Sequence, residues 1–345
     1  VPVIETVDCT RGALRMNQPW YREMNRYHWF VLIVAALGWL LDCFDQQLFI
    51  LARQPAMREL LDGASSPATI DEYGGYATSV FLMGWGIGGL LFGVMGDRVG
   101  RAKTMMITIL MYSLFTGLNA ASTAFWDFAV YRFLTGMGVG GEFAVGVALV
   151  AETMPDRARP YCLSILQALS AIGNISAAFV VMGMGKLVEM DVVNKATYWR
   201  PMFVIGAVPA VLALVVRWKL KEPERWQQVS HEGDIARKLG SYRELFGDPL
   251  WRKHALLGLG LAFSGIVGLW GVGFFTFDLV GNVLRQRFVA EGLTDAEITG
   301  EVNYWKGIAS MMMNIGAAFG MYGFAMLAQR TGRKPTFAVC FVAAL

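Results

Sequence analysis

Two aspartates interrupt an apolar stretch of the sequence, and their spacing makes them candidates for handling a proton. Asp42 and Asp45 occur in "LLDCFDQQLF", inside a run over 29–51 that is otherwise almost wholly apolar. Residues three apart share one face of a helix, so both carboxylates should point the same way, into a water-accessible cavity. A carboxylate at the centre of a bilayer costs about 2.5–3.5 kcal/mol even on gentle scales, so such groups are functional by default.

Arg132 is the one basic residue that we predict inside a membrane span, and it is a natural partner for these acids. At about 1.5 Å per residue, counted from Trp29 at the inner edge, Asp42 lies roughly 20 Å into an apolar core of ~30 Å. Counted from Trp126 at the outer edge, Arg132 lies roughly 21 Å from the inner edge. Two acids beside one base leave one acid without a counter-charge. That acid, partly desolvated and beside a like charge, could take up a proton and release it.

These residues need elements that hold them inside a membrane, and the composition supplies such elements. Apolar residues make up 55% of the 345 residues and charged residues 17%, with a mean hydropathy of +0.44. Long apolar windows, each near the ~20 residues that cross a bilayer, lie at 29–51, 76–95, 104–121, 126–149, 161–185, 201–218, 254–277 and 306–328. Eight windows in series exclude a soluble protein and predict an all-α polytopic membrane protein. A ninth opens at Thr336 and is cut off at Leu345, so we expect a chain truncated in its ninth span.

The positions of lysine and arginine predict the orientation. Most of the 30 occur before the first window or after the second, fourth, sixth and eighth, whereas the opposite connections hold few, among them Arg53 and Lys306. The richer side should be cytoplasmic, which places the N-terminus in the cytoplasm of a cell with this protein in its plasma membrane or bacterial inner membrane. The formal charge of +3 then reflects topology and not nucleic-acid binding.

The windows divide the chain into two unequal parts. We predict a cytoplasmic N-terminal segment (1–28), a six-helix bundle (29–218), a cytoplasmic linker (219–253) and a partial second bundle (254–345). An internal repeat supports this division, because "GDRVGRAK" follows the second window and "AQRTGRKP" follows the eighth. In this repeat Arg98, Gly100 and Arg101 align with Arg330, Gly332 and Arg333. Parallel repeats are one of the ways in which transporter folds are built.

These motifs resemble those of the major facilitator superfamily of secondary transporters. The signature after the second helix is present as Gly93, Asp97, Arg98, Gly100 and Arg101, although Ala102 stands where a basic residue is usual and Gln329 replaces the acid in the second copy. "YRFLTGMGVGGEF" and "AETMPDRAR" match further signatures, and "KEPERW" resembles the stretch after helix six in sugar and metabolite porters. The resemblance implies twelve helices in two halves, helices one and four side by side, and a loop that latches one conformation. A simple topology anchor is the alternative role for that loop.

Within this superfamily, "DCFD" and "GGEFAVGVALVAETMP" look most like the metabolite–proton and aromatic acid–proton symporters. We therefore expect proton-coupled symport of a small organic anion by alternating access, with Asp42, Asp45 and Arg132 as the proton-coupling and substrate site. A static Asp–Arg pair is the structural alternative for these residues. A sugar or polyol facilitator is the alternative function, and a non-transporting membrane sensor is a third, less favoured one.

Other classes find no support in the sequence. The three histidines lie at span ends or in the linker, and no nucleophile with a base and no metal-ligand spacing occurs, so we expect neither an enzyme nor a metal or cofactor. The expected partners are a small-molecule substrate, protons and the lipid bilayer, with the full-length protein working as a monomer.

Two further groups of residues are candidates for the transport cycle. A cavity between the halves should have a polar lining that includes Gln46, Gln167, Asn174 and Asn314, with interhelical hydrogen bonding as the alternative. A charge network that holds a cytoplasmic gate should include Glu142, Glu152, Arg157 and Arg159, near Arg101. Solvated surface pairs, worth ~0–1 kcal/mol, are the alternative there. The closely spaced glycines over 136–141 are expected to let helices approach each other rather than to touch substrate.

Overall fold

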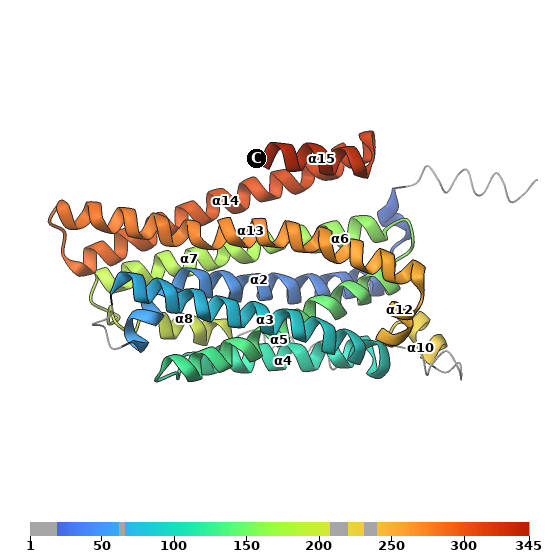
Figure 1. The fold of residues 1–345 in the computed structure, drawn as a ribbon, viewed down its shortest axis with the longest axis horizontal. Coiled ribbons are helices and arrows are strands. Elements are labelled where there is room, and N and C mark those ends of the chain that lie inside the picture. Colours follow the sequence, from blue (N-terminus) through green and yellow to red (C-terminus); the bar gives the residue numbers. More distant parts are fainter. Residues whose placement is uncertain (1–18, 62–65, 208–219, 231–239, 345) are drawn as a thin grey trace, which may run out of the picture.

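The computed structural model describes residues 19–61, 66–207, 220–230 and 240–344, and in these ranges the chain is helical with no β-strand (Figure 1). The long helices are α2 (Arg26–Leu60), α3 (Pro67–Val99), α4 (Arg101–Asn119), α5 (Phe125–Thr153), α7 (Ser170–Glu189), α13 (Pro249–Ala290) and α14 (Asp295–Thr331). The shorter ones are η1 (Trp20–Glu23), α6 (Arg159–Ala168), α8 (Trp199–Gly206), α10 (Glu224–Ser230), α12 (Tyr242–Gly247) and α15 (Arg333–Ala344). The all-α prediction is confirmed.

Each predicted window falls on a helix as far as the described residues extend. Five helical stretches are long and apolar enough to cross a membrane: Arg26–Leu60, Pro67–Val99, Phe125–Thr153, Arg159–Glu189 and Asp295–Ala328. The fourth of these combines α6 and α7, which are separated at Leu169. The sixth window lies partly outside the described residues, which stop at 207 on that side.

The first helix is longer than predicted, and this changes the inventory of buried charge. α2 continues through Arg53 and Arg58 to Leu60, and Arg53 is only 1% exposed. Lys306 is likewise buried, inside α14. The placement of Arg53 and Lys306 in outer connections was therefore wrong, and Arg132 is not the only arginine buried within a candidate span. These two charges can be buried because neighbouring helices supply polar partners for them. Spacing in the sequence does not reveal such partners.

Glycines bring α3 and α5 into close contact. A side chain at Gly136 or Gly140 of α5 would collide with the backbone carbonyls of Phe81 and Trp85 on α3. A Cβ added at Gly138 would lie only 2.7 Å from the Cβ of Tyr112 on α4. Membrane helices use small residues in this way because burial from water cannot drive their association. The packing interpretation of these glycines is confirmed.

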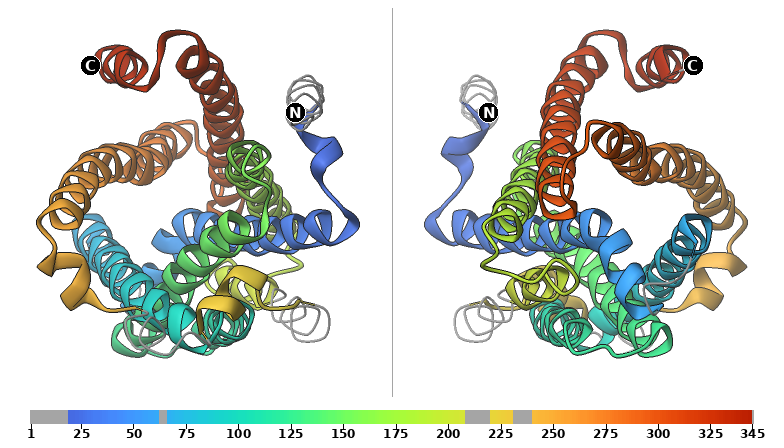
Figure 2. Two further views of the ribbon diagram at one scale, coloured as in Figure 1. Left: turned by 90° about the vertical axis from the view of Figure 1, so that its right-hand side faces the viewer. Right: turned by 90° about the vertical axis from the view of Figure 1, so that its left-hand side faces the viewer.

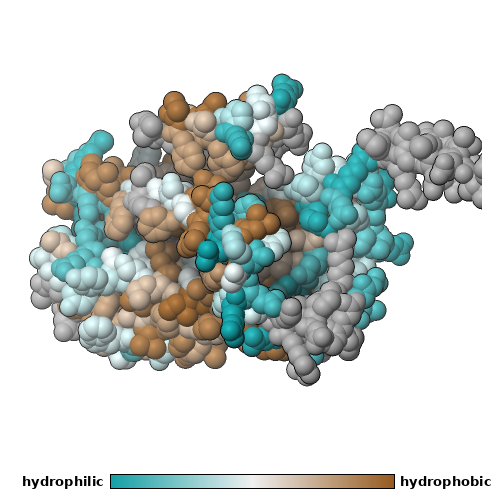
Figure 3. Space-filling view, turned by 45° about the vertical axis from the view of Figure 1, so that its right-hand side comes forward, coloured by the Kyte–Doolittle hydropathy of each residue, from teal (hydrophilic) through white to brown (hydrophobic). Residues whose placement is uncertain are grey.

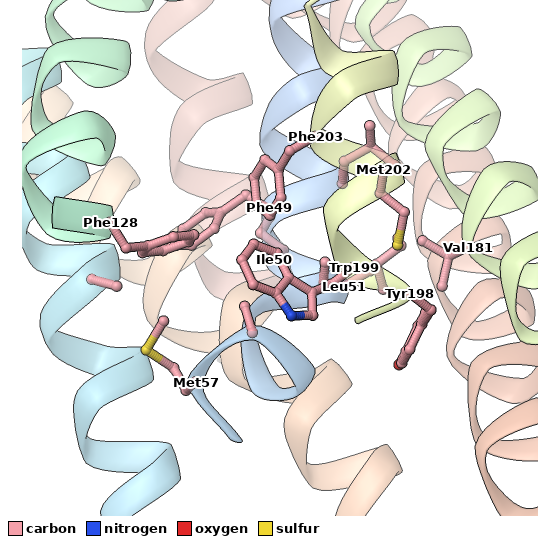
Figure 4. Close-up of a cluster of buried hydrophobic side chains, with 14 of the residues drawn as sticks. Phe49, Ile50, Leu51, Met57, Phe128, Val181, Tyr198, Trp199, Met202 and Phe203 are labelled. Carbon is pink, nitrogen blue, oxygen red and sulfur yellow. The ribbon is translucent and has the colours of Figure 1, made fainter. Parts of the chain in front are cut away.

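The N-terminal bundle has two buried apolar clusters, one towards each end of α2. Figure 4 shows the cluster around the C-terminal half of α2, where Phe49, Phe128 and Phe203 gather beside Trp199. The rings of Phe128 and Phe203 meet edge to face with their centroids 5.8 Å apart. We call this end of the molecule, where α2 and α13 end and α14 begins, the Arg53 end. The opposite end, where α3 ends and α4 begins, is the Arg101 end.

α13, α14 and α15 belong to the second part of the chain, and all stand on one side of the N-terminal bundle (Figures 1 and 2). α14 packs extensively along α7. The internal repeat appears in the backbone, because single glycines with positive φ separate α3 from α4 (Gly100, φ 120°) and α14 from α15 (Gly332, φ 89°). L-residues rarely adopt such a φ, so glycine is required at both joints.

The outward surface is suited to lipid. Large apolar side chains that are more than half exposed occur on several helices, among them Leu114, Trp126, Phe179, Leu257 and Phe319. Figure 3 shows broad hydrophobic areas on the face that it presents, with hydrophilic residues between and beside them. Soluble monomers rarely expose apolar patches of this extent.

Candidate functional site

The first group of buried charges joins α2 to α5. Arg132 Nη1 lies 3.7 Å from Asp45 Oδ2, and neither side chain is exposed. The rings of Phe49, Phe81 and Phe203 surround the guanidinium, with their centroids 4.9, 5.7 and 5.0 Å from Cζ. The charges of Asp45 and Arg132 therefore offset each other, and the rings separate Arg132 from water.

Asp42 does not join this pair, although it lies on the same helix only three residues from Asp45. Its carboxyl lies against the carboxyl of Glu142 on α5 and the phenol of Tyr112 on α4, and all three are fully buried. Glu142 also packs on Gly38 of α2, where any larger side chain would displace it. Among the described residues, neither Asp42 nor Glu142 forms an ion pair. Two carboxyls in contact away from water cannot both be charged, so one proton can be shared between them.

This position of Glu142 differs from the expectation that placed it in a charge network with Glu152. Glu152 lies roughly 15 Å further along α5, at about 1.5 Å per residue. The separation is large enough that the two glutamates face different environments: Glu142 faces Asp42 inside the bundle, and Glu152 faces Arg101 at the Arg101 end. The spacing along α5 was available in the sequence, but the partner on α2 was not.

Arg101 is the centre of the charged contacts at the Arg101 end. Its Nη2 lies 2.7 Å from Glu152 Oε1 and 2.6 Å from Asp97 Oδ1. Arg157 and Arg159 do not join it. Arg157 pairs with Glu23 at 3.5 Å, and Arg159 pairs with Asp156 at 2.5 Å, both on the surface.

The segment after residue 219 docks on the same loop, through contacts that sequence reasoning missed. Glu222 accepts hydrogen bonds from the backbone N–H groups of Ala102 (3.1 Å) and Lys103 (3.2 Å), at the N-terminus of α4. An anion there satisfies free N–H groups and suits the helix dipole. Trp226 Nε1 donates to the carbonyl of Asp97 at 2.7 Å. The sequence analysis used "KEPERW" only for its family resemblance. The signal that could have predicted this contact is that the segment carries Glu222, an acid able to cap the basic start of α4.

The remaining motif residues occupy the two repeat loops. Gly93 and Asp97 line a groove of about 750 Å³ whose other wall is formed by residues of α12 and the start of α13. Arg98 lies in the last turn of α3, and Arg330 is exposed near the end of α14. The backbone of Arg333 begins α15, but its side chain lies outside the described residues.

Of the residues predicted to line a central cavity, two form a hydrogen bond with each other and the other two lie apart from them. Asn174 Nδ2 on α7 donates to Asn314 Oδ1 on α14 at 2.7 Å, which links the two parts of the chain. Gln46 is buried, and its Nε2 has no partner among the described residues. Gln167 is exposed on α6, and the interruption at Leu169 removes it from the face of α7 that carries Asn174. Gln47, which was not predicted, donates to Ser310 Oγ at 2.9 Å.

The Arg53 end holds a second set of buried charges, which joins the first part of the chain to the second. Arg53 on α2 donates to Asp278 on α13 in a buried contact, and to Thr78 Oγ1 on α3 at 2.6 Å. Beside it, Lys306 Nζ donates to Gln54 Oε1 at 3.1 Å. Asp71 of α3 accepts from Gln54 at 2.8 Å and from Asn282 at 3.3 Å. These contacts join the two parts of the chain at the Arg53 end.

The first half of α13, towards the Arg101 end, carries few buried side chains. The described side chains of α13 from Pro249 to Ile266 are nearly all exposed, whereas Phe277 and Asp278 further along the helix are buried. Buried contacts thus join the two parts at the Arg53 end, whereas at the Arg101 end α12 and the start of α13 meet α3 across a groove.

Comparisons with known proteins agree with this arrangement. Residues 31–245 match the family described as "Sugar (and other) transporter". A "Putative metabolite transport protein" of Haemophilus influenzae is 30% identical over 321 residues, which cover 91% of this chain and 71% of that protein. A "Probable 4-methylmuconolactone transporter" of Cupriavidus pinatubonensis is 27% identical over 325 residues, or 94% of this chain and 68% of that protein. The xylose transporter XylE of E. coli, in a partially occluded inward open conformation, shares the fold with a TM-score of 0.61 at 19% identity, over 90% of this chain and 75% of that chain.

Proposed function

Because the chain belongs to the sugar (and other) transporter family of the major facilitator superfamily, we propose that it takes up a small organic anion together with protons. Membership in this family makes it a multi-pass membrane transporter and not an enzyme. The proton coupling, the anionic substrate and the direction of transport are the parts that we propose.

The pair of Asp42 and Glu142 is the observation that carries the proton coupling. Each carboxyl is fully buried, each lies against the other, and in the described part of the chain neither has a basic partner. Such a pair binds a proton in one state and can lose it when water or a cation reaches it. Movement of the two parts of the chain during transport would change that access, which couples proton release to the conformational change.

Asp45 and Arg132 have a different role in this proposal. The aromatic rings around Arg132 and the complete burial of both side chains favour a fixed pair that holds α2 against α5. Of the three residues that the sequence grouped as one site, Asp42 is thus the proton carrier. Asp45 and Arg132 position the helix that bears it.

The orientation follows from the positive-inside rule. We place the N-terminus and the Arg101 end in the cytoplasm of a cell that carries the protein in its plasma membrane or bacterial inner membrane. The Arg53 end then faces outward. We further propose that a single copy of the full-length protein performs transport.

A sugar facilitator is the second candidate, favoured by the description of the matching family and by the shared fold with the xylose transporter. The two candidates differ in their response to a pH gradient and in the charge of the substrate. Uptake of radiolabelled benzoate and xylose into proteoliposomes, with and without an inward proton gradient, separates them. Xylose uptake that ignores the gradient would favour the facilitator.

Variants of the acids test the proton site directly. Asp42→Asn and Glu142→Gln should abolish proton-driven accumulation while substrate exchange across the membrane continues. Asp45→Asn should instead lower the amount of folded protein, because removal of one partner from a buried pair costs ~3–5 kcal/mol. Asp156→Asn, at an exposed surface pair, is the matched control and should change nothing. Proton-driven accumulation that survives in both Asp42→Asn and Glu142→Gln would refute the proposed site.

A further inference from the structure

A cavity of about 450 Å³ at the Arg53 end lies between the two parts of the chain, and cations predominate on its wall. α2 and the segment 195–198 form one side, and α13 and α14 form the other. Its charged lining consists of the cations Arg58, Lys195, Arg285 and Lys306 and the acids Glu59 and Asp295. The wall therefore carries more positive than negative charge.

The two acids are already engaged. Glu59 accepts hydrogen bonds from Arg200 (Nη2 to Oε1, 3.0 Å) and from Trp199 Nε1 (2.5 Å). Asp295 lies 3.1 Å from Lys195 Nζ and 3.7 Å from Arg285 Nη2. In the described part of the chain, no acid forms an ion pair with the other two cations, Arg58 and Lys306.

Two buried donors on α14 also lack sufficient acceptors. Lys306 and Asn303 are each 3% exposed, and residues three apart on a helix are neighbours on one face. The terminal amine of Lys306 has more N–H donors than the one that its hydrogen bond to Gln54 Oε1 uses. Asn303 accepts from Tyr198 Oη at 3.5 Å, while its Nδ2 has no partner among the described residues.

Tyr198 helps to fix this arrangement. Burial is the main cause that raises the pKa of its phenol above the ordinary value, so the hydroxyl stays protonated at neutral pH and remains a donor. Because the hydroxyl donates to the amide oxygen of Asn303, the Nδ2 of Asn303 stays available for an acceptor in the cavity. Buried donors without acceptors are unfavourable until an acceptor arrives.

We propose that this cavity binds a small organic carboxylate, whose oxygens accept hydrogen bonds from Lys306 Nζ and Asn303 Nδ2. The volume falls in the range of about 300–1,000 Å³ that is usual for small-molecule sites and is larger than an inorganic anion needs. Pro55, Ala196 and Val302 supply apolar surface for the body of the molecule. Arg58, at the same wall, adds to the field that attracts an anion from outside.

The site would serve as an outer station that loads the transported anion, and this biological role rests on the proposed function. Binding itself does not depend on proton coupling. Because the two sides of the cavity come from different parts of the chain, a bound carboxylate would also bridge them and favour the closed Arg53 end.

Thermal unfolding of the full-length protein in lipid nanodiscs tests the site without any transport step. Titration with sodium benzoate should raise the melting temperature saturably, whereas sodium chloride at equal ionic strength and xylose should not. Lys306→Met should weaken the apparent affinity for benzoate at least tenfold. Arg58→Gln, at an exposed position where folding is not at risk, should weaken it severalfold. Arg287→Gln is the control, because Arg287 is exposed and pairs with Glu291 outside the cavity lining.

The outcomes separate this inference from the proposed function. Equal benzoate affinity in wild type, Lys306→Met and Arg58→Gln would overturn it, as would a shift with inorganic phosphate alone. A benzoate shift that needs Lys306, in a protein that shows no proton-driven uptake, would sustain the binding site and refute the proposed function. Proton-driven uptake of benzoate without any such shift would support the proposed function and refute the binding site.

Discussion

Removal of the Asp278 carboxylate should release the Arg53 end. Arg53 is buried with three partners: the carboxylate of Asp278, the hydroxyl of Thr78, and the ring of Phe275, whose centroid lies 5.1 Å from Cζ. Asp278→Asn keeps the shape of the side chain but leaves the guanidinium without its counter-charge. Loss of one partner of a buried ion pair costs ~3–5 kcal/mol. Since Thr78 and Phe275 remain, we take the lower figure of ~3 kcal/mol, which is roughly a hundredfold in the equilibrium between closed and open states.

The distance between the two parts of the chain reports this equilibrium. Val192 and Val289 are 64% and 57% exposed, lie near the Arg53 end, and belong to the first and second parts. Spin labels at these positions allow the distance to be measured by double electron–electron resonance on the full-length protein. Asp278→Asn should shift the distribution towards longer distances, because an open Arg53 end lets water reach Arg53.

Asp295→Asn is the matched control. It also removes an acid that links the two parts, but its contact with Lys195 is exposed, and exposed pairs are worth ~0–1 kcal/mol. The distribution should therefore stay close to that of wild type. If Asp278→Asn left the distribution unchanged, or changed it no more than Asp295→Asn, the buried pair would not hold this end closed and the reasoning would fail.

Two further variants test the packing and the docking of the linker. Gly140→Ala should lower the melting temperature by an amount that corresponds to ~1–3 kcal/mol or more, because its methyl group would collide with the carbonyl of Trp85. Gly86→Ala, on the same helix as Trp85 but with open space beside it, should be neutral, and equal effects of the two changes would contradict the packing argument. Glu222→Ala should cost ~0.5–2 kcal/mol through the loss of its cap on α4, measured by thermal unfolding. Glu224→Ala, nearby and exposed, should cost little, and a similar loss in both would show that the cap is unimportant.

Much of the fold was predictable because a bilayer demands long apolar helices. The window at 126–149 lies within α5, and the one at 76–95 lies within α3. The repeat was also predictable, because Gly100 and Gly332 occupy joints where positive φ requires glycine. Local physics decides such features, and a single sequence contains them.

Contacts between distant helices were not predictable in the same way. The predicted window ends at residue 51, yet α2 continues through Arg53, whose charge is offset by Asp278 on α13. Asp42 and Asp45 were rightly placed on one helix, but their different partners, Glu142 and Arg132, depend on how α5 is rotated against α2. Helix rotation is set by packing, and spacing along one chain does not specify it.

In the proposed mechanism, α2 connects the two buried charge groups and offers a physical route from the proton site to the Arg53 end. Asp42 lies in the acid pair inside the bundle, and Arg53 lies roughly 16 Å further along the same helix, at about 1.5 Å per residue. A helix is stiff over this distance, so a tilt of α2 about the pair of Asp45 and Arg132 would also move Arg53 relative to Asp278 on α13. The fixed pair of Asp45 and Arg132 lies between these two groups. Under this proposal the pair keeps α2 on α5, so that uptake or loss of one proton would bias how the two parts of the chain meet instead of only loosening the bundle.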